Sequence, residues 1–365
     1  MISTLKNVVV VGGSYVGLAA VKELVNILPA THRVLLVEPH SHFHHLFAFP
    51  RFSVIPSHEH KAFIPYTAAF STASDPSRHS VVRAKVLSLF PDRIVLDRDW
   101  QGTKEVPYDY VVITTGTRLP APGTMEHEDK ASSVDYLRSY QQRFKARTRL
   151  SSSAAVLWAS NGDGLEGDLS RQGSWGQGYH RCQGSGAGRR LPDTALRARA
   201  QGRPHSSSGP RHPRHGPDSQ QRFRQDVEAD DGIPLINPAN GFLAVKPTLQ
   251  LQDPAYPHIF AAGDIADTKA HKAARPGMAQ VEVVAKNIAA MIEGREPTDT
   301  LVVNPPAIHL TLGVTKNMIF RNPDTANGAT EPFVNMKEDG ALDMNIEGVW
   351  ARRGVKATKA DDFHL

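Results

Sequence analysis

The first forty residues of the chain combine short, continuous apolar runs with one longer stretch of helical spacing. NVVVV at 7–11 is apolar without interruption, which is typical of a strand buried on both faces of a parallel sheet. LAAVKELVNIL at 18–28 places its apolar residues three and four apart, which predicts an amphipathic helix. RVLLVE at 33–38 predicts a second buried strand that ends in an acid. We therefore expect a strand–turn–helix–strand unit.

The turn of this unit has the spacing of a dinucleotide-binding loop. Gly12, Ser14 and Gly17 stand at the positions of G-x-G-x-x-G, with a small serine in place of the middle glycine. Such a loop turns tightly, packs its helix closely on the strand, and offers free N–H groups and the positive helix end to phosphates. Glu38, 21 residues beyond Gly17, suits the adenosine ribose hydroxyls. A glycine-rich turn without a nucleotide is the alternative, but the surrounding strands, helix and acid favour a dinucleotide.

A second set of patterns further along the chain indicates a flavin. In PHIFAAGDIAD an apolar strand delivers Asp264 at its end, and a helical pattern follows at 278–292. An Asp at a strand end beside a helix N-terminus suits the ribitol hydroxyls and the pyrophosphate side of a flavin dinucleotide. Other strand-like runs lie at 81–89, 93–99 and 108–116, the last ending in Thr114-Thr115-Gly116.

These motifs together resemble those of a known family. VVVVGGSYVG…VLLVE, YDYVVITTG and HIFAAGDIAD are similar to the two-dinucleotide-domain flavoprotein reductases. SHFHHLFAFPR and GFLAVKPTLQLQDPAYPHIFAAGDIADTKAHKAARPGMAQVEVVAKNI resemble the apoptosis-inducing-factor-like and ferroptosis-suppressor-type branch, in particular its fungal AMID-like members. Those proteins are FAD-dependent NAD(P)H oxidoreductases that reduce quinones. The resemblance covers residues 7–150 and about 233–350.

The resemblance implies an α/β fold with two dinucleotide-binding domains, FAD as cofactor, NAD(P)H as co-substrate and a quinone-like acceptor. It implies a discontinuous FAD domain of residues 1–125 and 233–300, an NAD(P)H domain of residues 126–232 and a small α+β C-terminal domain of residues 301–365. Arg51 would contact the cofactor, and Val86 would hold the adenine through its backbone. No catalytic acid or base carries over. The family's FAD contacts correspond to Gly12, Gly13, Ser14, Val16, Gly17, Glu38, Arg51, Val86, Thr115, Gly116 and Asp264.

Charge and composition narrow the function further. The sequence pI of about 9.2 comes from one segment, because residues 159–225 contain eleven Arg, no Lys and five acids. We therefore expect no nucleic-acid partner. Cys182 is the one cysteine, which excludes a disulfide framework and a CxxC redox pair, so a cofactor has to carry any electrons. Four histidines cluster at 40–45, and we expect them to line the flavin pocket or face solvent rather than bind a metal.

Localisation signals are sparse. No run approaches the roughly 18 apolar residues of a membrane span, and Ile2 excludes N-myristoylation. The strand pattern begins almost at once, which leaves no room for a signal or transit peptide. We expect an intracellular, cytoplasmic protein without a transmembrane segment, with any membrane contact peripheral. The resemblance leaves lipid surfaces and mitochondria open.

The middle of the chain departs from the family pattern. EHEDKASSVDYLRSYQQRFKARTRL at 126–150 fits the helix that leads into the NAD(P)H domain. A Val/Ile-rich strand and a second glycine fingerprint should follow, yet between Val156 and Val227 there is no Val, Ile, Met or Lys. A parallel sheet depends on buried β-branched strands. We therefore expect this domain to be largely lost or disordered at 154–226.

Three interpretations of this segment compete: a natural Gly/Arg-rich linker, an RNA-binding low-complexity arm, and translation out of frame relative to the family. The segment has neither the regular repeat nor the interleaved aromatic residues that would support the first two interpretations. For the third, codons of 153–161 read from the third base can encode GGGAVGVE, and those from Asn161 read from the second base can encode MATDLKEIYPDKEV. These strings resemble the missing fingerprint and its helix. We favour the frame disturbance, which ends before DGIPLINPANGF, and the gene sequence over codons 150–232 decides the matter.

Two functional hypotheses follow. The chain is an FAD-dependent NAD(P)H:acceptor oxidoreductase, or it binds FAD but is impaired or inert because it lacks the NAD(P)H site. A flavin monooxygenase is a weaker third interpretation, since its second-domain motifs are missing too. The C-terminal stretches AIHLTLGVTKNMIF and ALDMNIEGVWARRG predict strands and a hairpin near the flavin face.

Overall fold

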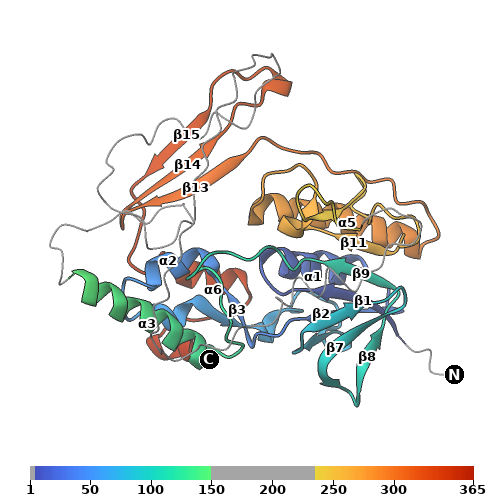
Figure 1. Cartoon of the computed structure of the whole chain (residues 1–365), viewed down its shortest axis with the longest axis horizontal. Coiled ribbons are helices and arrows are strands. Elements are labelled where there is room, and N and C mark those ends of the chain that lie inside the picture. The colour runs from blue at the N-terminus through green and yellow to red at the C-terminus, as the bar shows by residue number, and fades with distance from the viewer. Residues whose placement is uncertain (1–4, 149–234) are drawn as a thin grey trace, which may run out of the picture. The chain divides into compact units, whose positions relative to one another are not determined.

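A computed structural model describes residues 5–148 and 235–365 of the chain. Its centre is a five-stranded parallel sheet in the order β11-β9-β1-β2-β5 (Figure 1). The strands form where the sequence has continuous apolar runs, and most of their side chains are fully buried. Their bounds are β1 Lys6–Val11, β2 His32–Val37, β5 Ser80–Val82, β9 Tyr110–Ile113 and β11 Ile259–Ala261.

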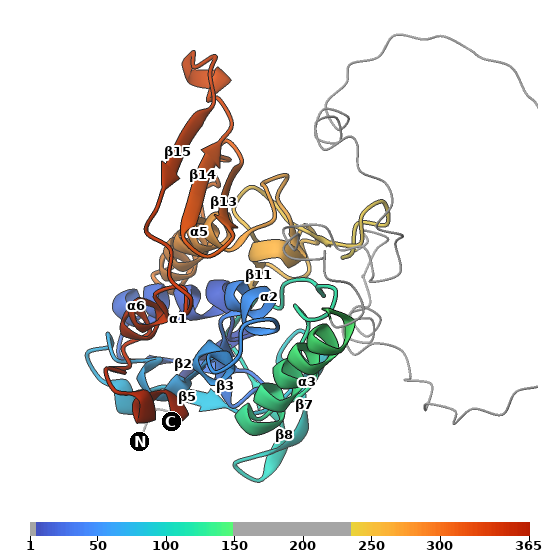
Figure 2. The ribbon, with the colours of Figure 1, turned by 90° about the vertical axis from the view of Figure 1, so that its left-hand side faces the viewer.

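Helices cover one face of this sheet. α1 (Tyr15–Ile27) and α5 (Ala274–Ile292) pack against each other and against the side chains of alternate sheet positions such as Val8, Val10 and Leu36. The short helix α6 (Ile346–Arg352) belongs to the same core, with Trp350 fully buried. Figure 2 shows α6 beside α1. Residues from both ends of the chain therefore complete one hydrophobic core.

The opposite face carries a second core. There Val9, Val11 and Leu35 pack against a three-stranded antiparallel sheet in the order β6-β7-β8. The result is three layers: helices, parallel sheet and antiparallel sheet. The smaller sheet consists of β6 Val86–Leu89, β7 Arg93–Trp100 and β8 Thr103–Pro107.

A third core lies around the segment that follows β2. Phe49, Phe52 and Phe63 pack there against the inward face of α3 (Lys130–Thr148). α3 is the helix expected at 126–150, and Gln141 fixes it by donating its side-chain amide to the Phe52 carbonyl at 2.8 Å. The short elements here are β3 His42–His44, α2 Phe49–Phe52 and β4 Phe63–Pro65.

The C-terminal part contains a three-stranded antiparallel sheet, β13-β14-β15. The expected hairpin at 307–320 is present as β13 and β14. The expectation of strand structure for the second stretch, 341–354, is wrong, because Ile346–Arg352 within it form the helix α6. Ile346, Val349 and Trp350 recur at helical spacing and bury one face. The remaining strands are β10 Leu243–Ala244, β12 Ala266–Asp267, β13 Ala307–Leu312, β14 Lys316–Arg321 and β15 Phe333–Lys337.

Several expectations concern residues that the structure does not describe. The loss or disorder at 154–226, its frame and Cys182 all lie outside the described residues. The domain limits therefore stay predictions. Within 5–148 and 235–365, no helix combines the length and the apolar character that a membrane crossing requires.

Candidate dinucleotide site

The glycine loop lies at the carboxyl end of β1, where the order in which the chain adds strands to the sheet reverses. From β1 the chain crosses to β2 on one side, and it later returns to β9 on the other. Loops at such a topological switch point form the ligand crevice of open α/β sheets. Most of the residues predicted for the site follow the ends of β1, β2, β9 and β11, and these ends share one edge of the sheet because all four strands are parallel.

Gly12 and Gly17 are required by close backbone contacts. Gly12 has φ +100°, and a Cβ there would lie 2.9 Å from the Thr114 carbonyl oxygen. A Cβ on Gly17 would lie 1.7 Å from the Gly12 carbonyl oxygen. These are the tight turn and the close helix–strand packing that the sequence predicted. Ser14 is the N-cap of α1, but its side chain makes no capping hydrogen bond, and the first turn of the helix holds no acid. No side chain of α1 itself therefore neutralises the positive end of the helix dipole or caps the free amides there.

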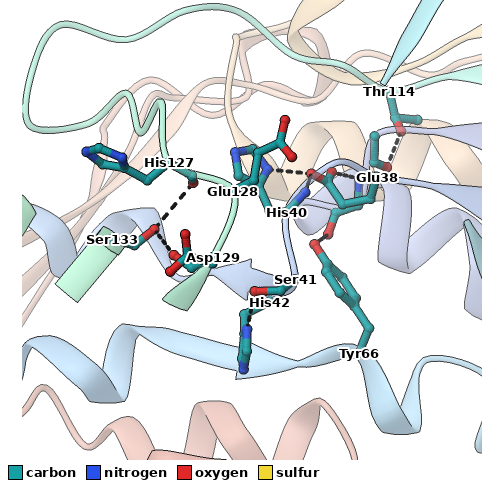
Figure 3. A network of polar contacts seen from close by, with 12 residues as sticks. Glu38, His40, Ser41, His42, Tyr66, Thr114, His127, Glu128, Asp129 and Ser133 are labelled. Atoms are coloured by element: carbon teal, nitrogen blue, oxygen red, sulfur yellow. Dashed lines mark hydrogen bonds and ion pairs between the residues drawn. The ribbon is translucent and has the colours of Figure 1, made fainter. Parts of the chain in front are cut away.

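Glu38 holds the loop from the end of β2 (Figure 3). Its buried carboxylate accepts the Gly13 N–H at 2.5 Å and the His40 N–H at 3.0 Å. The His40 ring nitrogen Nδ1 makes a further short hydrogen bond with the same carboxylate. The acid expected to bind ribose hydroxyls thus also fixes the conformation of the loop beside it.

Tyr66 completes this arrangement from an element that no motif indicated. Its hydroxyl donates to the Gly13 carbonyl at 2.9 Å, and a Cβ on Gly13 would lie 2.8 Å from that hydroxyl. Burial raises the pKa of Tyr66 well above its usual value, and the negative charge of Glu38 raises it further. Tyr66 therefore stays a neutral donor. Gly13 is confined between Tyr66 and Glu38, which explains a glycine at the variable position of the motif.

The end of β9 adjoins the loop. The Thr114 hydroxyl donates to the carbonyls of Val11 and Gly12 at 2.9 and 3.0 Å, and ties β9 to the turn. A Cβ on Gly12 would lie 3.2 Å from the Thr115 Cα. Gly116 follows with φ +66° and open space where its side chain would be. The structure thus places Thr115 beside the glycine loop, and Gly116 follows it in a turn whose conformation favours glycine.

Asp264 follows β11 in a turn that packs on the loop's helix. Val16 fills the space above Gly263 and Gly277, since Cβ atoms there would lie 3.1 and 2.6 Å from Val16 Cγ2. The Gly263 N–H donates to the Gln280 side chain at 2.7 Å. Burial raises the pKa of Asp264, while the positive charge of Lys272 lowers it. Val16 therefore acts through packing, and it brings α1, α5 and the Asp264 turn together.

Arg51 and Val86 lie in other surroundings. Arg51, in α2, donates to the Ala341 carbonyl at 2.6 Å and to the Gly313 carbonyl at 2.5 Å, so its guanidinium connects α2 with the loops of the C-terminal sheet. Val86 is buried on β6 and pairs with Leu96. Neither their cofactor contacts nor those of the other site residues are tested by this arrangement.

The four histidines after β2 differ in their burial and in the residues that they contact. His40 pairs with Glu38, and His42 contacts Ser41 and the Leu365 carbonyl. His44 is buried between Phe49 and Phe63, whereas His45 lies 2.7 Å from the Tyr15 hydroxyl. Burial lowers the pKa of His44 well below its usual value and that of His45 to about 4. No group of three His, Cys, Asp or Glu side chains among the described residues is arranged to hold a metal.

Comparison with solved structures identifies the fold. The sulfide:quinone oxidoreductase of the hyperthermophilic bacterium Aquifex aeolicus matches with a TM-score of 0.53 at 15% identity, over 91% of this chain and 87% of that one. The fold is that of the two-dinucleotide-binding-domain flavoproteins. The predicted fold class is thereby confirmed.

Sequence relatives extend the comparison. Fe-regulated protein 8 of Mycosarcoma maydis is 29% identical over 396 residues, which cover 96% of this chain and 95% of that protein. Ferroptosis suppressor protein 1 of Mus musculus is 32% identical over 119 residues, or 32% of this chain and 28% of that protein. No family model matches the chain. The relatives and the fold agree with the predicted resemblance to flavin-dependent oxidoreductases.

Proposed function

We propose that this protein is an FAD-dependent oxidoreductase that takes electrons from NAD(P)H and passes them to a quinone-like acceptor. The observation that carries the proposal is the convergence of the glycine loop, Glu38 and Asp264 at the switch point of the sheet. The likeness to a sulfide:quinone oxidoreductase and to a ferroptosis suppressor supports the flavin and the acceptor class. FAD supplies the electron-transfer chemistry when bound, and the protein supplies binding and orientation.

The described residues fit FAD. The loop brings N–H groups without obstructing side chains to the end of α1, where a diphosphate is favoured. Glu38 offers carboxylate oxygens to an adenosine ribose and would repel a 2′-phosphate. To Asp264, in the turn after β11, we assign the binding of the ribitol hydroxyls. The acceptor is not a disulfide reduced through a thiol pair, because the chain has one cysteine.

A second candidate function rests on the sequence of the middle segment. Residues 159–225 lack the β-branched residues from which an NAD(P)H-binding sheet is built. We propose as the alternative that the chain binds FAD but receives no electrons from NAD(P)H. In both functions the FAD site is the same, so one experiment separates them.

The first prediction distinguishes the oxidoreductase from a protein that binds FAD but receives no electrons from NAD(P)H. The purified full chain should be yellow and should release FAD on denaturation. Under argon, NADH or NADPH should bleach the flavin absorbance, and a water-soluble quinone should restore it.

A substitution at Glu38 tests the cofactor site itself. Glu38→Gln keeps the shape of the side chain and removes its charge. We expect it to weaken FAD binding about tenfold, because hydrogen bonds accepted by a carboxylate are stronger than those accepted by an amide.

The outcomes have distinct meanings. Protein that carries FAD but is not bleached by either nucleotide contradicts the oxidoreductase and supports the alternative. Folded protein that binds no FAD contradicts both. Bleaching that oxygen reverses but quinones do not would contradict the acceptor class alone.

A further inference from the structure

Arg353, the residue after α6, holds a positive charge among aromatic rings. Its guanidinium carbon lies 4.2 Å from the centre of the Phe43 ring and 5.5 Å from that of Tyr15. Within the described part of the chain, these ring contacts are the interactions of its guanidinium, with no carboxylate at ion-pair distance and no hydrogen-bond acceptor. Arg98 and Arg138, by comparison, each pair with two acids.

This environment disfavours the charge. Burial lowers the pKa of Arg353, and the neighbouring Arg352 lowers it further. Ring contacts compensate by only about 2 kcal/mol even when desolvated. A partly buried guanidinium has five N–H donors, and here the described residues accept from none of them, so these donors are left to solvent or to a ligand. An anion brought to it would supply what the protein itself does not.

The charge stands next to the glycine loop. Tyr15, under the guanidinium, is the first residue of α1 and directly follows Ser14. Tyr66, whose hydroxyl bonds to the Gly13 carbonyl, is also within the field of Arg353, which lowers the pKa of both tyrosines against the larger effect of burial. The same field contributes to the low pKa of His45, beside Tyr15. The positive potential therefore reaches both ends of the segment from Gly13 to Tyr15.

The backbone around Arg353 is fixed in place. Trp350, one turn earlier, is fully buried and donates its indole N–H to the Lys61 carbonyl at 2.9 Å. Gly354, directly after, has φ +76°, and a Cβ there would lie 2.9 Å from the Ala68 side chain. The backbone at Arg353 is thus fixed, and the contacts with Phe43 and Tyr15 orient its guanidinium before any ligand binds, which lowers the entropic cost of binding.

We propose that Arg353 is a positioning residue for the diphosphate of the bound dinucleotide, whose negative charge its guanidinium balances from beside the glycine loop. This inference rests on the proposed function, since it takes the loop as the diphosphate site. It assigns to the C-terminal segment a part in cofactor binding that the glycine motif alone would not indicate. The positive N-terminal end of α1 and the Arg353 guanidinium would act on the same anion from two elements.

The test compares three variants of the full chain, each stripped of cofactor and titrated with FAD, with ADP and adenosine as competitors. Arg353→Gln should weaken FAD and ADP about tenfold or more, because charge-assisted hydrogen bonds are lost, and should leave adenosine within about twofold. Arg352→Gln removes the same charge from an exposed neighbour and should have little effect. Arg353→Lys keeps the charge and should stay within about threefold of the unaltered protein.

Several results would overturn the inference. One such result is that Arg353→Gln weakens FAD binding no more than Arg352→Gln does. Another is that Arg353→Gln weakens adenosine binding as much as ADP binding, which is the sign of a purely structural role. Arg353→Lys binding as weakly as Arg353→Gln would also exclude charge as the basis, and this comparison remains valid if Arg353→Gln folds poorly. Failure of the unaltered protein to bind FAD contradicts the proposed function instead, and is recognised without any variant.

Discussion

At the scale of single residues, the sharpest constraint is the contact between Gly17 and the Gly12 carbonyl. A methyl group on Gly17 would lie 1.7 Å from that oxygen, so the strand and the helix would have to separate. We predict that Gly17→Ala lowers the free energy of unfolding by at least about 2 kcal/mol, through overpacking of backbone against backbone. It should also abolish FAD binding, because the loop between them would shift.

Gly348 provides the matched control. It too lies in a helix, but a Cβ there meets only the Arg352 guanidinium, at an ordinary 3.5 Å. Gly348→Ala should therefore raise the free energy of unfolding by up to about 1 kcal/mol, since alanine favours helix. Urea denaturation monitored by circular dichroism measures both. Equal effects of the two substitutions would contradict the role given to Gly17.

Residues with a motif were predictable, and residues that meet through packing were not. Gly12, Gly17 and Glu38 follow from spacing along one strand–helix–strand unit. Tyr66 and Arg353 come from segments far from the loop in sequence, and only the tertiary fold brings them to it. A partly buried tyrosine and an arginine that follows a late helix carry no spacing signal. Their roles could not be deduced before the fold was known.

At the scale of elements, α6 shows how much one short helix can contribute. Trp350 is fully buried, packs edge-on against Phe363 and bonds to the Lys61 carbonyl. We predict that Trp350→Ala lowers the free energy of unfolding by about 3–5 kcal/mol, as large-to-small core substitutions do. Trp350→Phe should cost less, about 1–3 kcal/mol, since it keeps the ring and loses the hydrogen bond.

Phe333 on β15 is the control for this prediction. It is 51% exposed, so Phe333→Ala should change the free energy of unfolding by no more than about 0.5 kcal/mol. Chemical denaturation of the three variants gives the order. If Trp350→Ala were as mild as Phe333→Ala, α6 would not be part of the core.

The elements of the parallel sheet could be predicted because strands buried on both faces have uninterrupted apolar runs. α6 could not, since seven residues with four apolar side chains fit a short strand as well as a helix turn. β15 escaped prediction for a related reason. Its sequence FVNMK has little burial in the structure, and strand formation there depends on pairing with β14.

At the scale of the whole molecule, two histidines, one buried and one partly buried, predict sensitivity to acid. The pKa values of His45 and His60 are both lowered to about 4, mainly by burial, with Arg353 and His364 respectively adding to the effect. Unfolded histidine has a pKa near 6.5. Between these values the unfolded state binds more protons, so the stability present above about pH 6.5 is lost as the pH falls toward 4.

The expected slope is up to about 1.4 kcal/mol per pH unit for each such histidine. Urea denaturation at several pH values from neutral to acidic measures it. His45→Asn removes one titrating group and should flatten the profile below pH 6.5, while stability at neutral pH changes much less with pH in both proteins. A profile of equal steepness in the variant would show that His45 is protonated as easily when folded as when unfolded.

The sharing of one core by α1 and α6 has a consequence for synthesis. The ribosome makes the first strand early and Trp350 only after the whole middle of the chain, so the N-terminal sheet cannot finish its core until translation is nearly complete. Everything encoded between them, residues 149–234 included, has to deliver the later codons in the correct reading frame. A folded core that contains both α1 and α6 is therefore itself a readout of complete translation through that region.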